Sequence, residues 1–270
     1  MYYDASNVGC GRYIVNIQGS KCFRAWKDGE EATSSTYREL TGVYTVLQSM
    51  PQYLTGKQVK WYTDNQCVVS IVHKGSMKKH LHDLAILIYK FACQHSIDIH
   101  MEWILQGQNE RADMLSRIVD RDNWQVSHAL FKFLNHVWGP FTIDRFADSN
   151  NTKLNKFNSK FWSPNTSGVD VFAFNWQGEH ENNRFVPPVY LISRCLRHIE
   201  HNRVNATLIV PYWPSAVFWP LLIDKNGGFQ GYISRFKIFK QAQGFFIKGS
   251  VPSIFTEKYN GAVLALNFVV

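Results

Sequence analysis

Four acidic residues fall where predicted secondary-structure elements begin or end. Asp4 closes the first predicted strand and Asp64 closes a later one. Glu39 lies near the start of a predicted helix, and Asp113 lies on a short helix further along the chain. Hydrolysis of a phosphodiester by two metal ions needs carboxylates that converge on ions roughly 3.5 to 4 Å apart, and Mg²⁺ takes oxygen ligands of this kind. The four acids are therefore candidate metal ligands and catalytic residues.

Each acid also has a purely structural interpretation. Asp64 can cap the helix that follows it, and Glu39 can be the reciprocal partner of Thr36 in a capping box. The other two acids can belong to a turn and to a solvated helix face. Glu39 lies four residues before the apolar Val43, at the margin of the helix face expected to be buried. One shared site accounts for all four positions at once.

Alternating and helical spacing of apolar residues predicts the elements that position these acids. Strands are expected at 1–4, 9–17, 21–26, 58–63 and 97–104, and helices at 36–50, 67–72, 81–91 and 110–117. The first of these strands is unusually short. The order of elements favours a mixed five-stranded sheet with helices on its faces. The fold class expected for the first domain, 1–120, is therefore α/β.

A second domain, 141–270, is expected after a connecting helix at 121–140. Its candidate strands are 141–144, 169–174 and 206–211, its candidate helices are 191–199 and 215–222, and short β-prone runs occupy 236–239, 244–247 and 262–270. This alternation of strands and helices again predicts an α/β domain.

The composition limits which partners and which cellular compartment are expected. The chain has 29 Lys and Arg against 21 Asp and Glu, a formal charge of +8, which favours polyanionic partners. Its five cysteines form no Cys-x-x-Cys pair, which indicates a reducing intracellular compartment, cytoplasmic or nuclear, and no structural zinc. No apolar run reaches the roughly 20 residues that span a bilayer, and no signal peptide is evident, so no membrane partner is expected.

A basic cluster lies between two predicted helices, close in sequence to the strand that delivers Asp64. It consists of Lys74, Lys78, Lys79, His80 and His82. A groove that presents these side chains to a phosphate backbone accounts for part of the excess positive charge. The alternative is a solvated loop without a binding role.

Four segments resemble the motifs of the RNase H domains of retroelements, in the order in which that family carries them. They are Tyr3–Gly11 (YDASNVGCG), Ser34–Leu40 (SSTYREL), Tyr62–Asn65 (YTDN) and Asn109–Arg117 (NERADMLSR). The last of them is the most specific. The resemblance implies an RNase H-like fold from the first residue to about residue 118.

The same resemblance implies an endonuclease that cuts the RNA strand of RNA–DNA hybrids with two Mg²⁺ or Mn²⁺ ions. Asp4 and Asp64 would lie closest to both ions, with Glu39 completing one coordination shell and Asp113 the other. A hybrid would be recognised by its shape and by the 2′-hydroxyls of its RNA strand. The candidate nucleic-acid contacts are Lys74, Lys78, Lys79, His80, Asn109 and Arg117. Cellular members of the family carry a histidine in the loop before the last acid, whereas this chain has QGQN at 106–109.

The second domain is similar to the segment that follows RNase H in retrotransposons of the DIRS type, which encode a tyrosine recombinase. The similarity rests on IDRFA at 143–147, NSKFW at 158–162, DVFAFNW at 170–176 and IVPYWPS at 209–215. It implies that the chain derives from a longer polyprotein, with reverse transcriptase and recombinase portions as its partners.

That segment is itself related to adenine N6-methyltransferases. Their Asp/Asn-Pro-Pro-aromatic motif supplies an acceptor for the amino group and a ring for stacking, and this chain has Val186, Pro187, Pro188 and Val189 in its place. Both the acceptor and the ring are therefore missing, and Tyr190, one position late, would point about 100° away on a helix. No glycine-bearing loop follows the strand at 141–144 either. A degenerate domain that scaffolds or holds nucleic acid, without S-adenosylmethionine, is expected.

Two other functions stay open on the sequence alone. The short first strand favours a non-catalytic nucleic-acid-binding remnant, because a shortened central strand loses ladder hydrogen bonds and holds Asp4 loosely. An active adenine N6-methyltransferase would require a cofactor pocket beside Pro187.

Overall fold

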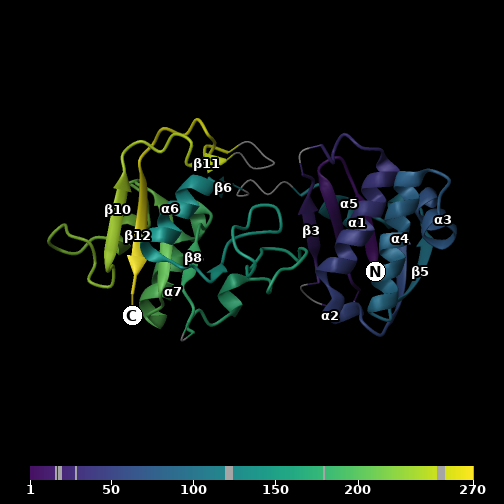
Figure 1. Cartoon of the computed structure of the whole chain (residues 1–270), viewed down its shortest axis with the longest axis horizontal. Coiled ribbons are helices and arrows are strands. Elements are labelled where there is room, and N and C mark those ends of the chain that lie inside the picture. The colour runs from purple at the N-terminus through teal and green to yellow at the C-terminus, as the bar shows by residue number, and fades with distance from the viewer. Residues whose placement is uncertain are drawn as a thin grey trace. The chain divides into compact units, whose positions relative to one another are not determined.

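The chain divides into two compact units (Figure 1). The computed structural model describes residues 1–15, 17, 20–27, 29–118, 124–178, 180–247 and 253–269. The first unit comprises residues 1–119 and 161–166, and the second comprises 120–160 and 167–270. The segment 161–166 belongs to the first unit because the carbonyl of Trp162 accepts a hydrogen bond from Cys22 Sγ (2.9 Å) and its ring packs on Tyr53.

The first unit is built on a mixed five-stranded sheet. Its strands are β1 (Tyr2–Ala5), β2 (Gly9–Tyr13), β3 (Cys22–Ala25), β4 (Gln58–Thr63) and β5 (Asp98–Trp103), in the spatial order β3-β2-β1-β4-β5. Antiparallel pairing joins β1, β2 and β3, whereas β1, β4 and β5 pair in parallel. The short β1 is therefore the central strand. The mixed five-stranded α/β sheet predicted from the sequence is confirmed.

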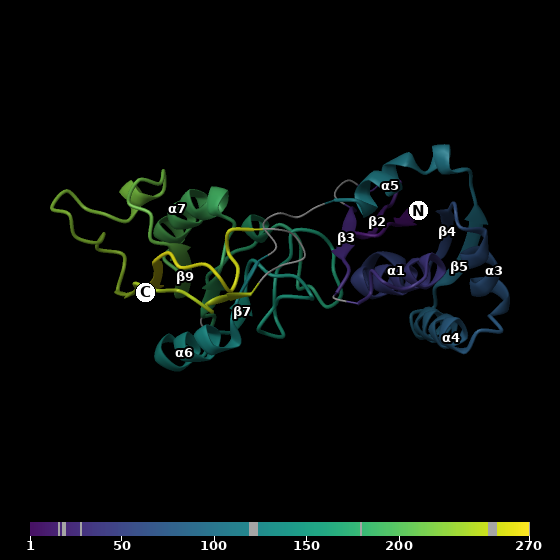
Figure 2. The ribbon, with the colours of Figure 1, turned by 90° about the horizontal axis from the view of Figure 1, so that it is seen from above.

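Helices cover both faces of this sheet. They are α1 (Ser35–Ser49), α2 (Pro51–Leu54), α3 (Gln66–Lys74), α4 (Lys79–Gln94) and α5 (Glu110–Ser116), with a 3₁₀ turn at Gln106–Gln108. Figure 2 shows α1 and α4 on one side of the strands and α5 on the other. Both α1 and α5 pack on β1 and β2. Successive side chains of β1 point to opposite faces, and this double cover buries both Tyr3 and Asp4.

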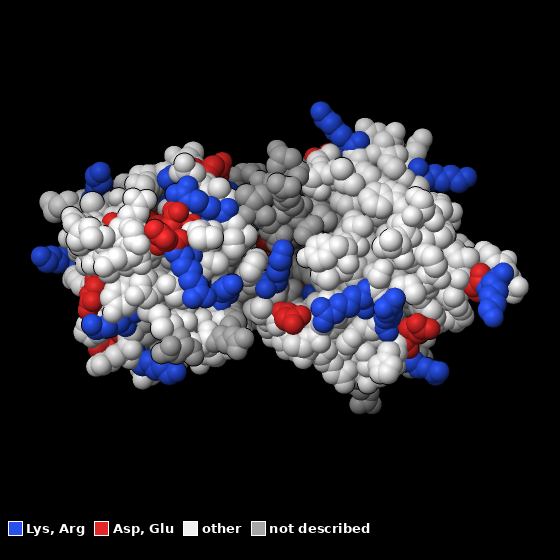
Figure 3. All heavy atoms as spheres, turned by 180° about the vertical axis from the view of Figure 1, so that it is seen from behind, with Lys and Arg blue, Asp and Glu red and all other residues white. Residues whose placement is uncertain are grey.

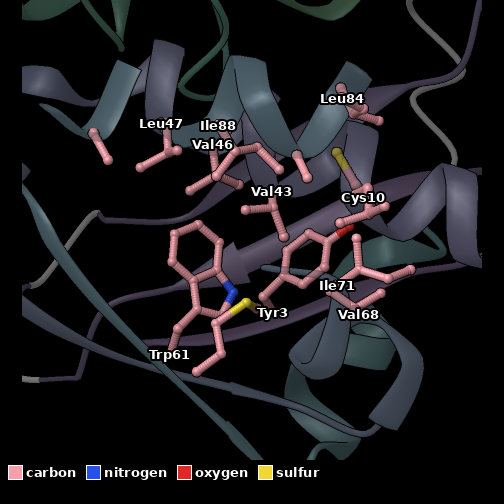
Figure 4. Packing of buried hydrophobic residues seen from close by; sticks show 14 of the residues in the cluster. Tyr3, Cys10, Val43, Val46, Leu47, Trp61, Val68, Ile71, Leu84 and Ile88 are labelled. Atoms are coloured by element: carbon pink, nitrogen blue, oxygen red, sulfur yellow. The ribbon is translucent and has the colours of Figure 1, made fainter. Parts of the chain in front are cut away.

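The core between the sheet and α1 is apolar and aromatic. Tyr3 and Trp61, from the neighbouring strands β1 and β4, meet edge to face with ring centroids 5.9 Å apart. Figure 4 shows these rings beside Val43 and Val46 of α1 in the same buried cluster. The hydroxyl of Tyr3 donates to the carbonyl oxygen of Glu39 (2.8 Å), which satisfies the buried phenol. That bond also fixes the start of α1 against the central strand.

Side-chain caps determine where α1 and α3 begin. Ser34 caps α1 and Asn65 caps α3, and each side chain accepts a backbone N–H at 3.2 Å. Thr36 is not a cap, so the capping-box alternative for Glu39 is wrong. The cap of α3 is Asn65 rather than Asp64, so that alternative is wrong as well.

The second unit contains another mixed five-stranded sheet and a separate two-stranded ribbon. The sheet has β7 (Ile143–Asp144), β8 (Asn183–Phe185), β9 (Ala206–Pro211), β10 (Arg235–Phe239) and β12 (Val263–Phe268), in the order β10-β12-β9-β8-β7, and the ribbon pairs β6 (Gln125–Val126) with β11 (Phe246–Ile247). β7, β8 and β9 are parallel, and β12 is antiparallel to both neighbours. The helices are α6 (His128–Trp138) and α7 (Ile192–Asn202), with 3₁₀ turns at Val171–Ala173, Val189–Leu191 and Trp219–Leu221.

Three local predictions for the second unit differ from the structure. The region 169–174 is not a strand, because Asp170 has a left-handed backbone (φ 59°) and its side chain accepts from Phe172 N, which starts a 3₁₀ turn. The region 215–222 is not an α-helix, because Pro220 lies inside its one short helical turn. The strand β8 is not predicted at all, because its buried Asn183 and Arg184 interrupt the apolar pattern.

The helix predicted at 121–140 as a connector is shorter in the structure. Residues 121–123 lie outside the described residues, Gln125–Val126 form β6, and α6 begins only at His128. The buried Leu134 and Trp138 of α6 belong to an apolar cluster of the second unit. α6 is thus part of that unit's core rather than a connector. In the described part of the chain, no helix has both the length and the apolar character to cross a bilayer.

Candidate metal centre

Three carboxylates meet at the carboxyl end of the central strands. β1 and β4 are parallel neighbours, with Tyr2 opposite Tyr62. Asp4 and Asp64 each come two residues after this pair, so the backbone brings them to the same level of the sheet. Glu39 reaches the same point from α1. One ligand oxygen from each of these three carboxylates lies within 4.8 Å of the other two.

Glu39 is the most deeply buried of the three, with 4% of its surface exposed. Its Oε1 accepts from Ala5 N at 3.4 Å, whereas its Oε2 is buried without a hydrogen-bond partner. Burial raises the pKa of Glu39 well above its ordinary value, and the charges of Asp4 and Asp64 raise it further. The protein alone therefore does not compensate a negative charge at Glu39.

Asp4 is 6% exposed and is held by a hydrogen bond from α5. Ser116 Oγ donates to Asp4 Oδ2 at 2.6 Å. Burial raises the pKa of Asp4, the bond from Ser116 lowers it, and the charges of Asp64 and Asp113 raise it again, so the net shift is upward. The anionic form of this buried acid is thus destabilised unless a cation joins it.

Asp113 lies on the wall of the same pocket but outside the three-carboxylate cluster. The pocket has a volume of about 520 Å³, and all four predicted acids line it together with Asn65, Trp103 and Arg117. Arg117 donates to Asp113 Oδ1 through Nε (2.9 Å) and Nη2 (2.7 Å). The structure therefore brings the four acids to one pocket and three of them to within ligand distance of one another.

Buried polar contacts and a glycine hold α5 against the sheet. Asn109 Nδ2 donates to the carbonyl oxygen of Tyr3 at 2.9 Å, and Ser6 Oγ donates to the carbonyl oxygen of Ser116 at 2.7 Å. Gly11 of β2 lies directly under α5, where a Cβ would be 2.4 Å from Ser116 N. Because no larger residue permits this approach, the position of α5 depends on Gly11.

The donor set fits a hard divalent cation. All the converging ligand atoms are carboxylate oxygens, which Mg²⁺ and Mn²⁺ accept. The buried Oε2 of Glu39 is an acceptor with no donor, and such an atom costs free energy until a donor or a cation meets it. A bound cation would also offset the repulsion among the three carboxylates. Asp4, Glu39 and Asp64 are therefore the residues that would hold the metal.

The lysines predicted to contact nucleic acid lie at the far end of α3 from Asp64. Lys74 ends α3, Lys78 immediately precedes α4, and both are exposed. Lys79, at the start of α4, is also exposed and pairs with Asp83 at 3.0 Å. α3 is nine residues long, so Lys74 lies about 14 Å along the helix from the end that borders the acidic pocket.

His80 links this basic cluster to the helix that carries Glu39. The ring of His80 lies 6.0 Å from the ring of Tyr37, which is on α1 two residues before Glu39. Elsewhere, basic and acidic side chains are interspersed on the face of the molecule drawn in Figure 3. The candidate interface with a phosphate backbone is therefore the named cluster.

The two other predicted nucleic-acid contacts have partners within the protein. Asn109 is 1% exposed, and its side-chain amide supports β1. Arg117 is exposed at the rim of the pocket, where it pairs with Asp113. Asn109 thus has a supporting position, whereas Arg117 is accessible to a ligand.

Two residues of the site escape prediction from the sequence: Ser116, which bonds a pocket acid, and Trp103, which lines the pocket. Ser116 contacts Asp4 across 112 positions of the chain, and nothing local marks that contact. Trp103 Nε1 donates to the carbonyl oxygen of Asp64 at 3.0 Å, and its ring is exposed in the pocket. The only signals available are that Ser116 lies in the closing motif and that Trp103 ends an alternating strand.

Comparisons with known proteins relate the chain to RNase H structures. No family model and no curated protein matches it. It is similar to the RNase H1 called LC11 in complex with an RNA/DNA hybrid, at 18% identity and a TM-score of 0.34, over 42% of this chain and 90% of that chain. RNase H1 from the archaeon Halobacterium salinarum gives 15% identity and a TM-score of 0.33, over 42% and 90%. The N-terminal RNase H domain of a Mycobacterium tuberculosis protein, fused to maltose-binding protein, gives 16% and 0.34, over 42% and 85%.

A separate pocket lies in the second unit, after the carboxyl ends of β7 and β8. It has a volume of about 270 Å³, and its lining includes Arg145, Phe172, Val186, Pro188, Tyr190 and Arg194. The guanidinium carbon of Arg194 lies 3.7 Å from the centroid of the Phe172 ring. Tyr190 is on a 3₁₀ turn rather than an α-helix, and it lines the same pocket as Val186 and Pro188.

Proposed function

We propose that the first unit is a metal-dependent RNase H-type endonuclease that hydrolyses the RNA strand of RNA–DNA hybrids. The observation that carries the proposal is the convergence of Asp4, Glu39 and Asp64, with ligand oxygens within 4.8 Å of one another. These carboxylates lie in a pocket open to solvent, which a nucleic-acid backbone can enter, and Asp113 lines the same pocket. The order of the four sequence motifs supports the same activity.

Each acid has a distinct part in this proposal. Divalent ions, when bound, supply an activated water and stabilise the leaving oxygen of the phosphodiester. Asp4, Glu39 and Asp64 hold the cation, and Asp113 completes the set from α5. The side chain of Arg117 is 59% exposed, so it can exchange its bond to Asp113 for a phosphate of the substrate. That exchange would release Asp113 for metal binding at the time the substrate arrives.

The basic cluster supplies the contact with the substrate backbone. Lys74 and Lys78 are exposed, and His80 lies beside the start of α1. A duplex that places one phosphate in the acidic pocket extends towards these residues along α3. The contact is with phosphates, so the choice of a hybrid depends on duplex shape and on the 2′-hydroxyls.

The test is cleavage of a labelled RNA–DNA hybrid in Mn²⁺ by the full chain and by Asp64→Asn. We expect the wild type to cut the RNA strand and the variant to lose at least 100-fold in rate, about 2.7 kcal/mol of transition-state stabilisation. Asp98→Asn is the matched control, because Asp98 is an exposed acid at the opposite end of the sheet. Equal cleavage by wild type and Asp64→Asn would overturn the proposal.

A non-catalytic nucleic-acid-binding role is the second candidate for the first unit. The ion pair between Asp113 and Arg117 favours it, because it keeps one acid outside the three-carboxylate cluster. Binding of the hybrid by the wild type, without cleavage in Mg²⁺ or Mn²⁺, would decide for this role.

For the second unit we propose descent from a DIRS-type polyprotein and a role in holding nucleic acid or neighbouring polyprotein portions. The pocket beside Val186 and Pro188 supplies a cavity near the motif, which an adenine N6-methyltransferase would also need. The absence of an acceptor side chain at Val186 argues against methyl transfer. Calorimetry with S-adenosylmethionine tests this, and we expect no heat of binding; a measurable heat would revive the methyltransferase function.

A further inference from the structure

Ser116 is a fully buried residue at the end of α5 with two acceptors for a single hydroxyl proton. Its Oγ lies 2.6 Å from Asp4 Oδ2 and 2.8 Å from the carbonyl oxygen of Asp113. A carboxylate is the stronger acceptor, and the shorter distance is the one to Asp4. The hydroxyl proton therefore belongs to the bond with Asp4.

The competing arrangement is the common one for serine in a helix, a bond to the carbonyl three residues earlier. That arrangement would leave Asp4 Oδ2 without a donor in a site where Asp4 is only 6% exposed. A buried acceptor without a donor is costly, whereas the carbonyl of Asp113 lies in the last turn of α5, where carbonyls normally lack helical partners. The balance favours the bond to the carboxylate.

We propose that Ser116 is a positioning residue of the metal centre, which holds Asp4 through Oδ2 and leaves Oδ1 for the cation. The inference rests on the proposed function and adds to it a residue that connects two elements, β1 and α5, each of which carries an acid of the site. Ser116 is three residues after Asp113 on α5, and it bonds to Asp4 on β1. One hydroxyl thus couples the strand-borne acid to the helix that carries the fourth acid.

The backbone around Ser116 is fixed independently of its side chain. Its carbonyl oxygen accepts from Ser6 Oγ at 2.7 Å, and Gly11 lies beneath its backbone nitrogen. α5 therefore keeps its place when the hydroxyl of Ser116 is removed, and the loss falls on the orientation of Asp4. This separates a positioning role from a merely structural one.

The experiment measures metal binding by the full chain and by Ser116→Ala, without substrate. Tb³⁺ luminescence excited through Trp103, which lines the same pocket, reports binding directly, and competition with Mn²⁺ gives its affinity. Partners of metal ligands are typically worth about 10- to 100-fold in affinity, so we expect Ser116→Ala to bind Mn²⁺ at least tenfold more weakly. Ser49→Ala is the matched control, because it removes a buried serine hydroxyl that bonds a helical carbonyl, the one of Thr45, at the end of α1 away from Glu39.

The outcomes separate this inference from the proposed function. If the wild type binds no metal, the proposed function fails and the inference with it. If the wild type binds metal and a folded Ser116→Ala binds it equally well, only the inference fails. Should circular dichroism show that Ser116→Ala is unfolded, Ser116→Cys keeps the volume and offers only a weak donor. Ser116→Cys is also expected to bind Mn²⁺ more weakly than the wild type. If it binds Mn²⁺ as tightly as the wild type does, the inference is overturned.

Discussion

Among the site residues, Glu39 has the carboxylate whose negative charge the surrounding protein compensates least. It is buried, it faces two other acids, and one of its oxygens has no donor. Unsatisfied buried charge is the kind of local cost that folded chains retain at functional sites. The free energy of unfolding of the metal-free chain should therefore depend on the ionisation of Glu39.

Glu39 predicts how the free energy of unfolding depends on pH in the absence of metal. Its pKa is raised in the folded state, so the folded chain holds the proton more tightly than the unfolded chain does. The stabilisation is full below the ordinary pKa of a glutamic acid, about 4.3, and is lost as pH rises through the raised value. Urea unfolding in EDTA from pH 5 to pH 8 should show this fall.

The variant Glu39→Gln isolates this effect. It should flatten the pH dependence and be more stable than the wild type at pH 8 by about 1 kcal/mol, while Mg²⁺ should stabilise the wild type more than the variant. Glu102→Gln is the control, since Glu102 is an exposed acid paired with Lys60. A wild-type stability that rises from pH 5 to pH 8 would contradict the assigned burial.

At the scale of single residues, the sequence predicts the acids but not their supports. Asp4, Asp64 and Glu39 could be found because each lies at the end or start of a recognisable element. The supporting contact from Ser116 to Asp4 joins residues 112 positions apart, and no local pattern encodes it. The ion pair that holds Asp113 through Arg117 lies within the predicted helix and could have been anticipated from its i, i+4 spacing.

At the scale of elements, the position of α5 decides whether the site forms. The helix is only seven residues long, and it is held by contact with the bare backbone of Gly11 and by a few buried hydrogen bonds. Short helices gain little from intrinsic propensity, so packing must position this one.

The variant Gly11→Ala tests this dependence. Its Cβ would lie 2.4 Å from the backbone of Leu115 and Ser116, so the helix must shift, at a cost of roughly 1 to 3 kcal/mol in the free energy of unfolding. Metal affinity should fall with it, because Ser116 moves away from Asp4. Gly107→Ala, with nothing within 4 Å of its added Cβ, should leave both properties unchanged. Wild-type stability and metal affinity in Gly11→Ala would refute the packing argument.

Elements with a regular apolar pattern could be predicted, and those stabilised by polar burial could not. β4 and β9 match their predicted bounds because Gln58–Thr63 and Ala206–Pro211 are rich in β-branched and aromatic or apolar residues. β2 ends at Tyr13 rather than at 17, because the side chain of Ser20 bonds both backbone groups of Ile14 and turns the chain; Asn16 lies outside the described residues. β8 escapes prediction because tertiary partners, such as the ion pair between Arg184 and Asp144 (2.5 Å), stabilise its buried polar residues.

At the scale of the whole molecule, the excess positive charge becomes useful only where a duplex seated in the acidic pocket can reach it. Lys74 and Lys78 offer such a contact at the far end of α3 from the pocket. Phosphate contacts make binding depend on salt, because counterions are released when a complex forms.

The double variant Lys74→Ala/Lys78→Ala should bind an RNA–DNA hybrid more weakly and with a shallower salt dependence. Each phosphate contact that is lost should reduce the slope of log K against log salt by about 0.9, while metal affinity stays unchanged. Lys57→Ala is the control, because Lys57 precedes β4 at the end opposite to Asp64. Fluorescence anisotropy at several salt concentrations gives the slopes, and an unchanged slope in the double variant would remove these lysines from the interface.

The most direct measurement of the central claim is an anomalous difference map from crystals of the full chain grown with Mn²⁺. The claim is that Asp4, Glu39 and Asp64 form one site for divalent ions. We expect a peak bound by oxygens of all three residues, and no peak in crystals of Asp64→Asn prepared in the same way. A well-ordered wild-type map with no Mn²⁺ among these carboxylates would contradict the account.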